Sequence, residues 1–195
     1  MPAHDRAEKP VPRRQPRRNQ RGAAREPHRS PKAQRRGAAR LAAVQALYQI
    51  ELTGASPDRV LREFVAHRIE PHPGDEAEET IGDTDRELFA AIVRGASERR
   101  TELDEMVGSA LAAGWSLERM DRVLRALLRA GAYELFARAE TPARVAIAEY
   151  VGVANAFYEG REPGFVNGVL DKLARVLRPE EMAGAPPSEP PPQGG

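Results

Sequence analysis

Three arginines, Arg35, Arg36 and Arg40, stand at the start of an amphipathic stretch that covers residues 35–52. Apolar residues recur in this stretch at three- and four-residue spacing, which predicts a helix with one apolar stripe. Cations at the N-terminus of a helix oppose its macrodipole, so their placement favours an external partner with negative charge. Arginine presents a fixed fork of N–H donors that matches phosphate oxygens. The pattern therefore predicts nucleic-acid binding, and the alternative is a solubilising tail in front of an ordinary helix.

The charge of the chain is divided unevenly along its length. The 195 residues together carry a formal net charge of only +1. Residues 1–40, however, contain 13 Lys and Arg against three Asp and Glu, whereas residues 41–195 contain 17 Lys and Arg against 26 Asp and Glu. A basic arm on an acidic body is typical of a protein whose arm meets an anionic partner, and it is equally consistent with an arm that folds back on its own body.

A second candidate segment is GFVNGVLDKLARVL, near the C-terminus. Gly168 inside an otherwise strong helix costs about 1 kcal/mol relative to Ala, and Asn167 beside it is also a poor helix former. This pair favours either the close approach of another backbone or an exposed polar contact. Phe165 follows Pro163 in the first turn, where a partly exposed ring could stack on an unpaired base. The alternative for Phe165 is a position in the core.

The sequence contains no pattern typical of an enzyme, a metal site or a cofactor site. It has no cysteine, no pair of histidines at helical spacing, no glycine-rich phosphate loop and no nucleophile elbow. We therefore expect no catalysis, no metal and no cofactor. The sequence contains no run of 18 apolar residues, so it predicts no membrane span. The N-terminus lacks the apolar centre of a secretory signal. The lack of cysteine is consistent with a cytoplasmic location.

The elements that must position these residues are predicted to be helices. No segment shows sustained two-residue alternation rich in Val, Ile and Thr, which favours an all-α fold. A break between two groups of helices is expected near residues 71–83. Caps and helix breakers predict helices over the following ranges: 35–52, 57–70, 84–98, 100–112, 117–138, 143–158 and 163–178. The predicted N-caps include Ser56, Thr84 and Ser116, and Gly54 is the predicted stop of the first helix. Residues 1–34 and 179–195 each hold six prolines and few large apolar side chains, which predicts a disordered basic arm and a disordered Pro-rich tail. The folded domain is expected over residues 35–178.

Three blocks of the sequence, in their order and spacing, resemble the NusB transcription antitermination family: RRGAARLAAVQALY at 35–48, VLRALLRAGAYEL at 123–135 and VAIAEYVGVANAFYEGREPGFVNGVLDKLA at 145–174. The resemblance implies an all-α fold of about seven helices in two packed helical bundles. It also implies binding of single-stranded boxA RNA from ribosomal RNA operon leaders, in a heterodimer with the ribosomal protein NusE. That heterodimer would then join the antitermination complex on RNA polymerase.

The same resemblance assigns site residues. RNA contact is implied for exposed polar, basic and aromatic positions of the matching motifs: Arg35, Arg36, Arg40, Gln45, Tyr48, Phe165, Asn167 and Lys172. The NusE surface is implied on the helix 117–138, through Arg129, Tyr133 and Glu134. Two other hypotheses stay open. One is a helical protein-interaction module without direct RNA readout, and the other is a homodimer in which two bodies cover each other's RNA face.

Overall fold

The computed structural model describes residues 29–69 and 83–183. These residues form helices and connecting turns and contain no strand, so the predicted all-α class is confirmed. Most of the predicted arm 1–34 and tail 179–195 lies outside the described residues. Both predicted boundaries are nevertheless misplaced, because residues 31–34 and 179–182 are helical.

Helix α1 spans Pro31–Thr53 and so begins before the predicted start at residue 35. Ser30 is the N-cap: its hydroxyl accepts the N–H of Ala33, while Pro31 occupies the first helical position, where no backbone N–H is needed. The helix ends at Gly54, whose φ of 68° is left-handed backbone that glycine adopts without strain. The predicted stop at this glycine is therefore confirmed.

Helices α2 and α3 pack with α1 in a first bundle. α2 spans Pro57–Phe64 and continues into a π-helical turn, η1, over Val65–Ile69. α3 spans Arg86–Glu98, and its N-cap is Asp85, whose carboxylate accepts the N–H of Leu88. The predicted cap, Thr84, is instead buried beside it.

The second bundle contains the remaining helices: α4 (Arg100–Ala110), the 3₁₀ turn η2 (Leu117–Arg119), α5 (Arg122–Ala137), α6 (Ala143–Asn155), α7 (Glu162–Leu177) and α8 (Pro179–Met182). The predicted single helix 117–138 is therefore wrong at its start. Asp121, and not Ser116, caps α5, because its carboxylate accepts the N–H groups of Val123 and Leu124.

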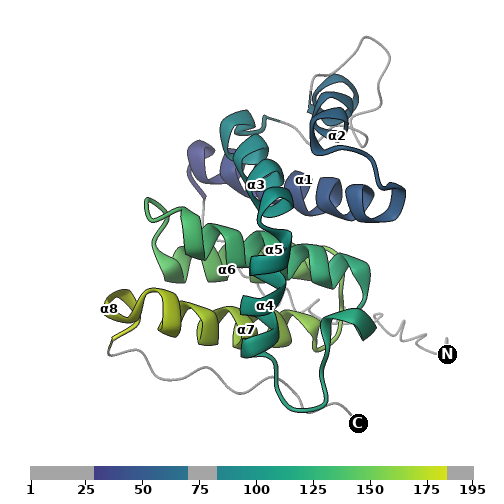
Figure 1. Ribbon diagram of the computed structural model, residues 1–195. Coiled ribbons are helices and arrows are strands. Elements are labelled where there is room, and N and C mark those ends of the chain that lie inside the picture. Colours follow the sequence, from purple (N-terminus) through teal and green to yellow (C-terminus); the bar gives the residue numbers. More distant parts are fainter. Residues whose placement is uncertain (1–28, 70–82, 184–195) are drawn as a thin grey trace, which may run out of the picture.

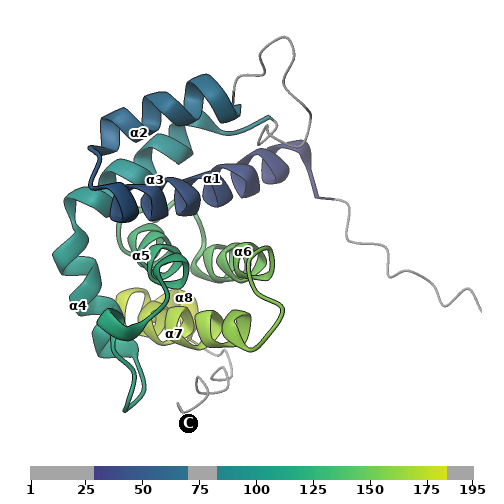
Figure 2. The ribbon, with the colours of Figure 1, turned by 90° about the vertical axis from the view of Figure 1, so that its right-hand side faces the viewer.

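Helix α5 lies at the centre of the molecule (Figure 1). It packs against α1 and α3 of the first bundle and against α4, α6 and α7 of the second. Figure 2 looks nearly along α5, α6 and α7, with α1, α2 and α3 lying across them and α4 connecting the bundles along one side. Helices α1 and α7 therefore lie on opposite sides of α5.

Small residues allow the helices to approach closely at these contacts. Ala39, Ala42, Ala43 and Ala46 of α1 are fully buried. A Cβ added to Gly131 of α5 would lie 2.8 Å from the side chain of Leu170 on α7. Gly168 of α7 is buried as well, which favours the close-packing interpretation of that glycine.

None of the helices in the described ranges is long and apolar enough to cross a membrane. Nor do the described His, Asp and Glu side chains form a group of three that could hold a metal ion.

Candidate nucleic-acid interface

Arg40 is buried and paired inside the protein. Its side chain is 2% exposed, and its guanidinium donates to both carboxylate oxygens of Glu134, from Nε at 2.9 Å and from Nη2 at 2.6 Å. Its Nη1 lies 3.4 Å from Glu149 of α6. The expected exposure of Arg40 to RNA and of Glu134 to a partner protein is therefore wrong, because the two side chains bind each other in the core.

The buried pair is ionised in the folded protein. Burial by itself would raise the pKa of Glu134, but the hydrogen bonds and the positive charge of Arg40 outweigh burial and hold that pKa below its ordinary value. Burial raises the pKa of the Tyr150 hydroxyl, and the charge of Glu134 raises it further, so Tyr150 remains a donor to Glu134 at 3.1 Å. A buried charge is stable only when it is paired and hydrogen-bonded, and this carboxylate meets both conditions.

The accessible cations of α1 lie nearer to its start than Arg40 does. Arg35 is half exposed, and its Nε lies 3.0 Å from Asp83, which is 77% exposed. Arg36 is partly exposed and donates from Nη2 to the hydroxyl of Thr141 at 2.8 Å. Lys32, one turn earlier, is exposed. Because an exposed ion pair contributes about 0–1 kcal/mol, a phosphate group can replace Asp83 at Arg35 at small cost.

Gln45 and Tyr48 line a groove of about 500 Å³ further along α1. The opposite wall includes Phe64 of α2 and Arg68 of η1. The Arg68 guanidinium lies 5.6 Å from the centre of the Phe64 ring and donates to Oε1 of Gln45 at 3.4 Å. An aromatic ring, an amide and a guanidinium around one groove can stack on a base and hydrogen-bond its edge. The other lining residues are Val44, Gln49, Leu52, Val123 and Phe157.

The π-helical turn η1 borders both the cations and the groove. Its last residue, Ile69, lines a second hollow, of about 820 Å³, together with Lys32 and Arg35. Its neighbour Arg68 lines the groove just described. We call this surface the α1–η1 face and define it by Lys32, Arg35, Gln45, Tyr48 and Arg68.

The residues predicted on α7 do not join this face. Phe165 is 1% exposed, and its ring centre lies 4.4 Å from that of Trp115. The expected exposure of this ring is therefore wrong, and Phe165 is a core residue. Asn167 is half-buried, while Lys172 is exposed and donates from Nζ to the carbonyl of Ser109 at 3.1 Å. These α7 residues are separated from the α1–η1 face by α5 (Figure 1).

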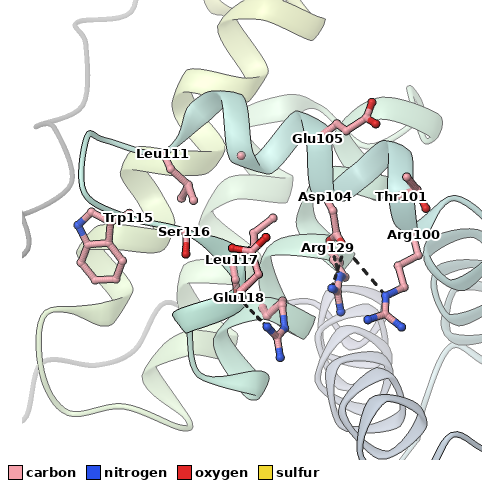
Figure 3. Close-up of a pocket in the computed structure, with 12 residues that line it drawn as sticks. Arg100, Thr101, Asp104, Glu105, Leu111, Trp115, Ser116, Leu117, Glu118 and Arg129 are labelled. Carbon is pink, nitrogen blue, oxygen red and sulfur yellow. Dashed lines mark hydrogen bonds and ion pairs between the residues drawn. The ribbon is translucent and has the colours of Figure 1, made fainter.

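Arg129, predicted to contact a partner, instead joins three helices. Its Nε and Nη2 donate to the carboxylate of Asp104 on α4 at 2.5 and 2.9 Å, and its Nη1 pairs with Glu51 of α1. Figure 3 shows Arg129 turned toward Asp104 at the wall of a pocket between α4 and α5, with Arg100 beside the same carboxylate. The side chain is buried, so its expected exposure to a partner is wrong.

Tyr133 is half-buried against the first bundle. Its ring lies over Gly95 of α3 so closely that an added Cβ there would be 2.1 Å from ring atoms. Among the three predicted partner contacts, Tyr133 is thus the one that keeps accessible surface, since Arg129 and Glu134 are buried.

Sequence reasoning did not identify Arg68 as a candidate. Arg68 belongs to a π-helical turn within a segment predicted as ordinary helix, and only the tertiary fold brings it opposite Gln45. Its position after Phe64, four residues apart on the same helical face, is the one sequence signal for a cation–π contact.

Comparison with known proteins relates this arrangement to one family. Residues 37–175 match the model of the NusB family. The chain is 48% identical over 179 residues to the transcription antitermination protein NusB of Rhodopseudomonas palustris strain BisB18, covering 90% of this chain and 93% of the relative. It is also 48% identical over 139 residues to the transcription antitermination protein NusB of Caulobacter vibrioides, covering 71% of this chain and 91% of the relative.

Solved structures share the fold. One form of T. maritima NusB matches 75% of this chain and 95% of its own, at a TM-score of 0.60 and 26% identity. A crystal structure of antitermination factors NusB and NusE in complex with dsRNA contains a chain that matches 72% of this chain and 96% of its own, at a TM-score of 0.57 and 26% identity.

Proposed function

The chain belongs to the NusB family, and we propose that it is a transcription antitermination factor that binds the boxA RNA of ribosomal RNA operon leaders together with NusE. The proposal gives the protein a binding role, in which the complex with NusE and RNA joins RNA polymerase and supports processive transcription. The observation that carries it is 48% identity over 179 residues with a relative named for transcription antitermination. The similarity to a chain solved with NusE and RNA supports the two partners.

The α1–η1 face is the proposed RNA contact. Lys32 and Arg35 are placed to neutralise phosphates, because both are exposed and the ion-pair partner of Arg35 within the described residues is a solvated carboxylate. Tyr48 offers a ring for stacking, and Gln45 offers an amide for a base edge. Along α1, Arg35 and Gln45 are separated by roughly 15 Å at 1.5 Å per residue, a distance that a short single strand can span.

Titration of a boxA-bearing single strand, with and without NusE, tests the proposed function. Fluorescence anisotropy of the labelled RNA gives the Kd, and a scrambled RNA of the same composition is the control ligand. We expect the protein to bind boxA RNA more tightly than the scrambled RNA, and NusE to strengthen the difference. Equal affinity for both RNAs in the presence of NusE would contradict the proposal.

Variants of the groove test where the RNA binds. Gln45→Ala and Arg68→Gln should weaken boxA binding while the unfolding midpoint stays near that of the natural chain, because both side chains are partly or fully exposed. Arg94→Gln is the matched control, since Arg94 forms an exposed ion pair with Asp58 that lines none of the hollows of the α1–η1 face.

A second function, a protein-interaction module without direct RNA readout, is favoured by the apolar rim of the same groove. Leu52 is 52% exposed and Phe157 is 37% exposed there. Exposed apolar side chains grouped around a groove are typical of protein contact surfaces. Under this alternative, Leu52→Ser would weaken binding of NusE without RNA present, and Gln45→Ala would leave the affinity for boxA RNA unchanged.

A further inference from the structure

Arg29, the first residue that the structure describes, is held by a carboxylate of α6. Its Nη1 lies 3.2 Å from one oxygen of Glu149 and 3.3 Å from the other. Half of the Arg29 side chain is exposed, whereas Glu149 is largely buried. The pair joins the end of the basic arm to the body of the protein.

The pair lies in a hollow of about 440 Å³ between α1 and α6. Small residues form both walls, including Gly37 and Ala38 on α1 and Gly152 on α6. A Cβ at Gly37 would lie 3.3 Å from Oε2 of Glu149 and 3.5 Å from Nη1 of Arg29. Glycine at this position therefore leaves the space in which the two side chains meet.

Glu149 has a second cationic neighbour, Arg40, at 3.4 Å. Arg40 does not depend on it, because two shorter hydrogen bonds already bind Arg40 to Glu134. Neutralising Glu149 would therefore leave the core pair in place and change mainly the environment of Arg29. This separation makes the role of Glu149 testable without unfolding the protein.

We propose that Arg29 is a further phosphate-binding residue of this protein and that Glu149 competes with RNA phosphate for it. The inference rests on the proposed function. In the free protein the carboxylate occupies the Arg29 donors, and a phosphate of bound RNA replaces it, since Arg29 is half exposed and Glu149 keeps Arg40 as a second cationic neighbour. Glu149 thereby lowers the affinity of the protein for RNA of any sequence, whereas the residues of the groove determine the sequence preference.

The test is a double-mutant cycle on the full chain bound to NusE, with boxA RNA as the probe. Glu149→Gln should tighten RNA binding about twofold to fivefold, the effect of releasing one exposed cation. The slope of log affinity against log salt should stay near that of the natural chain, because Arg29 contacts the same phosphate in both complexes. Arg29→Gln in the Glu149→Gln background should remove the gain in affinity and make that slope shallower by about 0.7, the value for one phosphate contact on a single strand.

The matched control is Glu105→Gln, which removes the same charge from an exposed position on α4, away from the start of α1 (Figure 2). Thermal unfolding of each variant checks that the Arg40–Glu134 pair is intact. The inference is overturned if Glu149→Gln binds no more tightly than Glu105→Gln, or if the gain survives the loss of Arg29. Failure of the natural chain to prefer boxA RNA is a different result and overturns the proposed function itself.

Discussion

Arg40 of α1 and Glu134 of α5 bind each other in the core through two hydrogen bonds, of 2.9 and 2.6 Å, although the sequence motifs assign them to two different surfaces. The pair crosses the boundary between the two bundles. Arg36, one turn before Arg40, lies 4.0 Å from the same carboxylate. The interior pair therefore holds the helix that carries the exposed cations in a defined orientation on the body of the protein.

Truncating Arg40 should strongly destabilise the fold. Arg40→Ala leaves the buried Glu134 carboxylate without its cation, which costs about 3–5 kcal/mol in the free energy of unfolding. Urea denaturation at pH 7 measures the change. Arg94→Ala, at an exposed ion pair, is the control and should stay within about 0.5 kcal/mol. Similar midpoints for the two variants would show that the core pair does not stabilise the protein.

Stability should be nearly constant at neutral pH and fall in acid. Burial would raise the pKa values of Glu51 and Glu134, but hydrogen bonds from arginines outweigh it and lower both. A carboxyl with a lowered pKa contributes stability that is complete above its unfolded pKa and is lost as the pH falls through its folded pKa. We therefore expect the free energy of unfolding to decline below about pH 5, and Glu134→Gln to reduce that slope. A protein that grows more stable between pH 6 and pH 4 would contradict the assignment of these carboxylates.

Phe165 and Tyr48 should separate stability from RNA binding. Phe165→Ala empties a core position beside Trp115 and costs about 3–5 kcal/mol of stability, while the folded fraction keeps its boxA affinity. Tyr48→Ala should keep a free energy of unfolding closer to that of the natural chain. Its free energy of RNA binding should weaken by roughly 1–3 kcal/mol, the contribution of one stacked base. Chemical denaturation and RNA titration on the same samples measure both effects. The reverse pattern, with RNA binding lost only in the Phe165 variant, would move the site to α7.

Two helical glycines should respond oppositely to the same substitution. Gly95→Ala forces a methyl group into the ring of Tyr133 and should destabilise the fold by about 1–3 kcal/mol through overpacking. Gly108→Ala, near the end of α4, meets no atom within 4 Å and should stabilise by up to about 1 kcal/mol through helix propensity. Thermal unfolding of the two variants compares them directly. Equal shifts in Tm would mean that α3 does not lie on Tyr133 as described.

Local signals predicted the helices well and the buried polar pairs poorly. Gly54 and Ser56 end and begin helices as predicted, because each cap acts on its own neighbouring backbone. Ser116 did not cap α5, since Asp121 lies closer to the regular helix and binds its first free N–H groups. Where two cap residues compete, the sequence alone does not decide between them.

The burial of Arg40 did have a sequence signal. Arg40 precedes Val44 and Leu47 by four and seven residues, which places it on the buried stripe of α1. The spacing indicates a buried position, whereas the positive charge of an arginine indicates an exposed one, and the prediction followed the charge. The partner, Glu134, lies 94 residues away, and the Arg29–Glu149 pair joins residues 120 apart. No periodicity within one helix can predict which charge another helix will bring to it.

The measurement that tests the central claim most directly is the salt dependence of boxA binding by the complex with NusE, for the natural chain, Arg35→Gln and Arg94→Gln. The account predicts that Arg35→Gln weakens binding and makes the slope of log affinity against log salt shallower by about 0.7, the loss of one phosphate contact, while Arg94→Gln leaves the slope unchanged. If the two variants have the same slope as the natural chain, or lose affinity equally, the exposed end of α1 is not where this protein meets RNA.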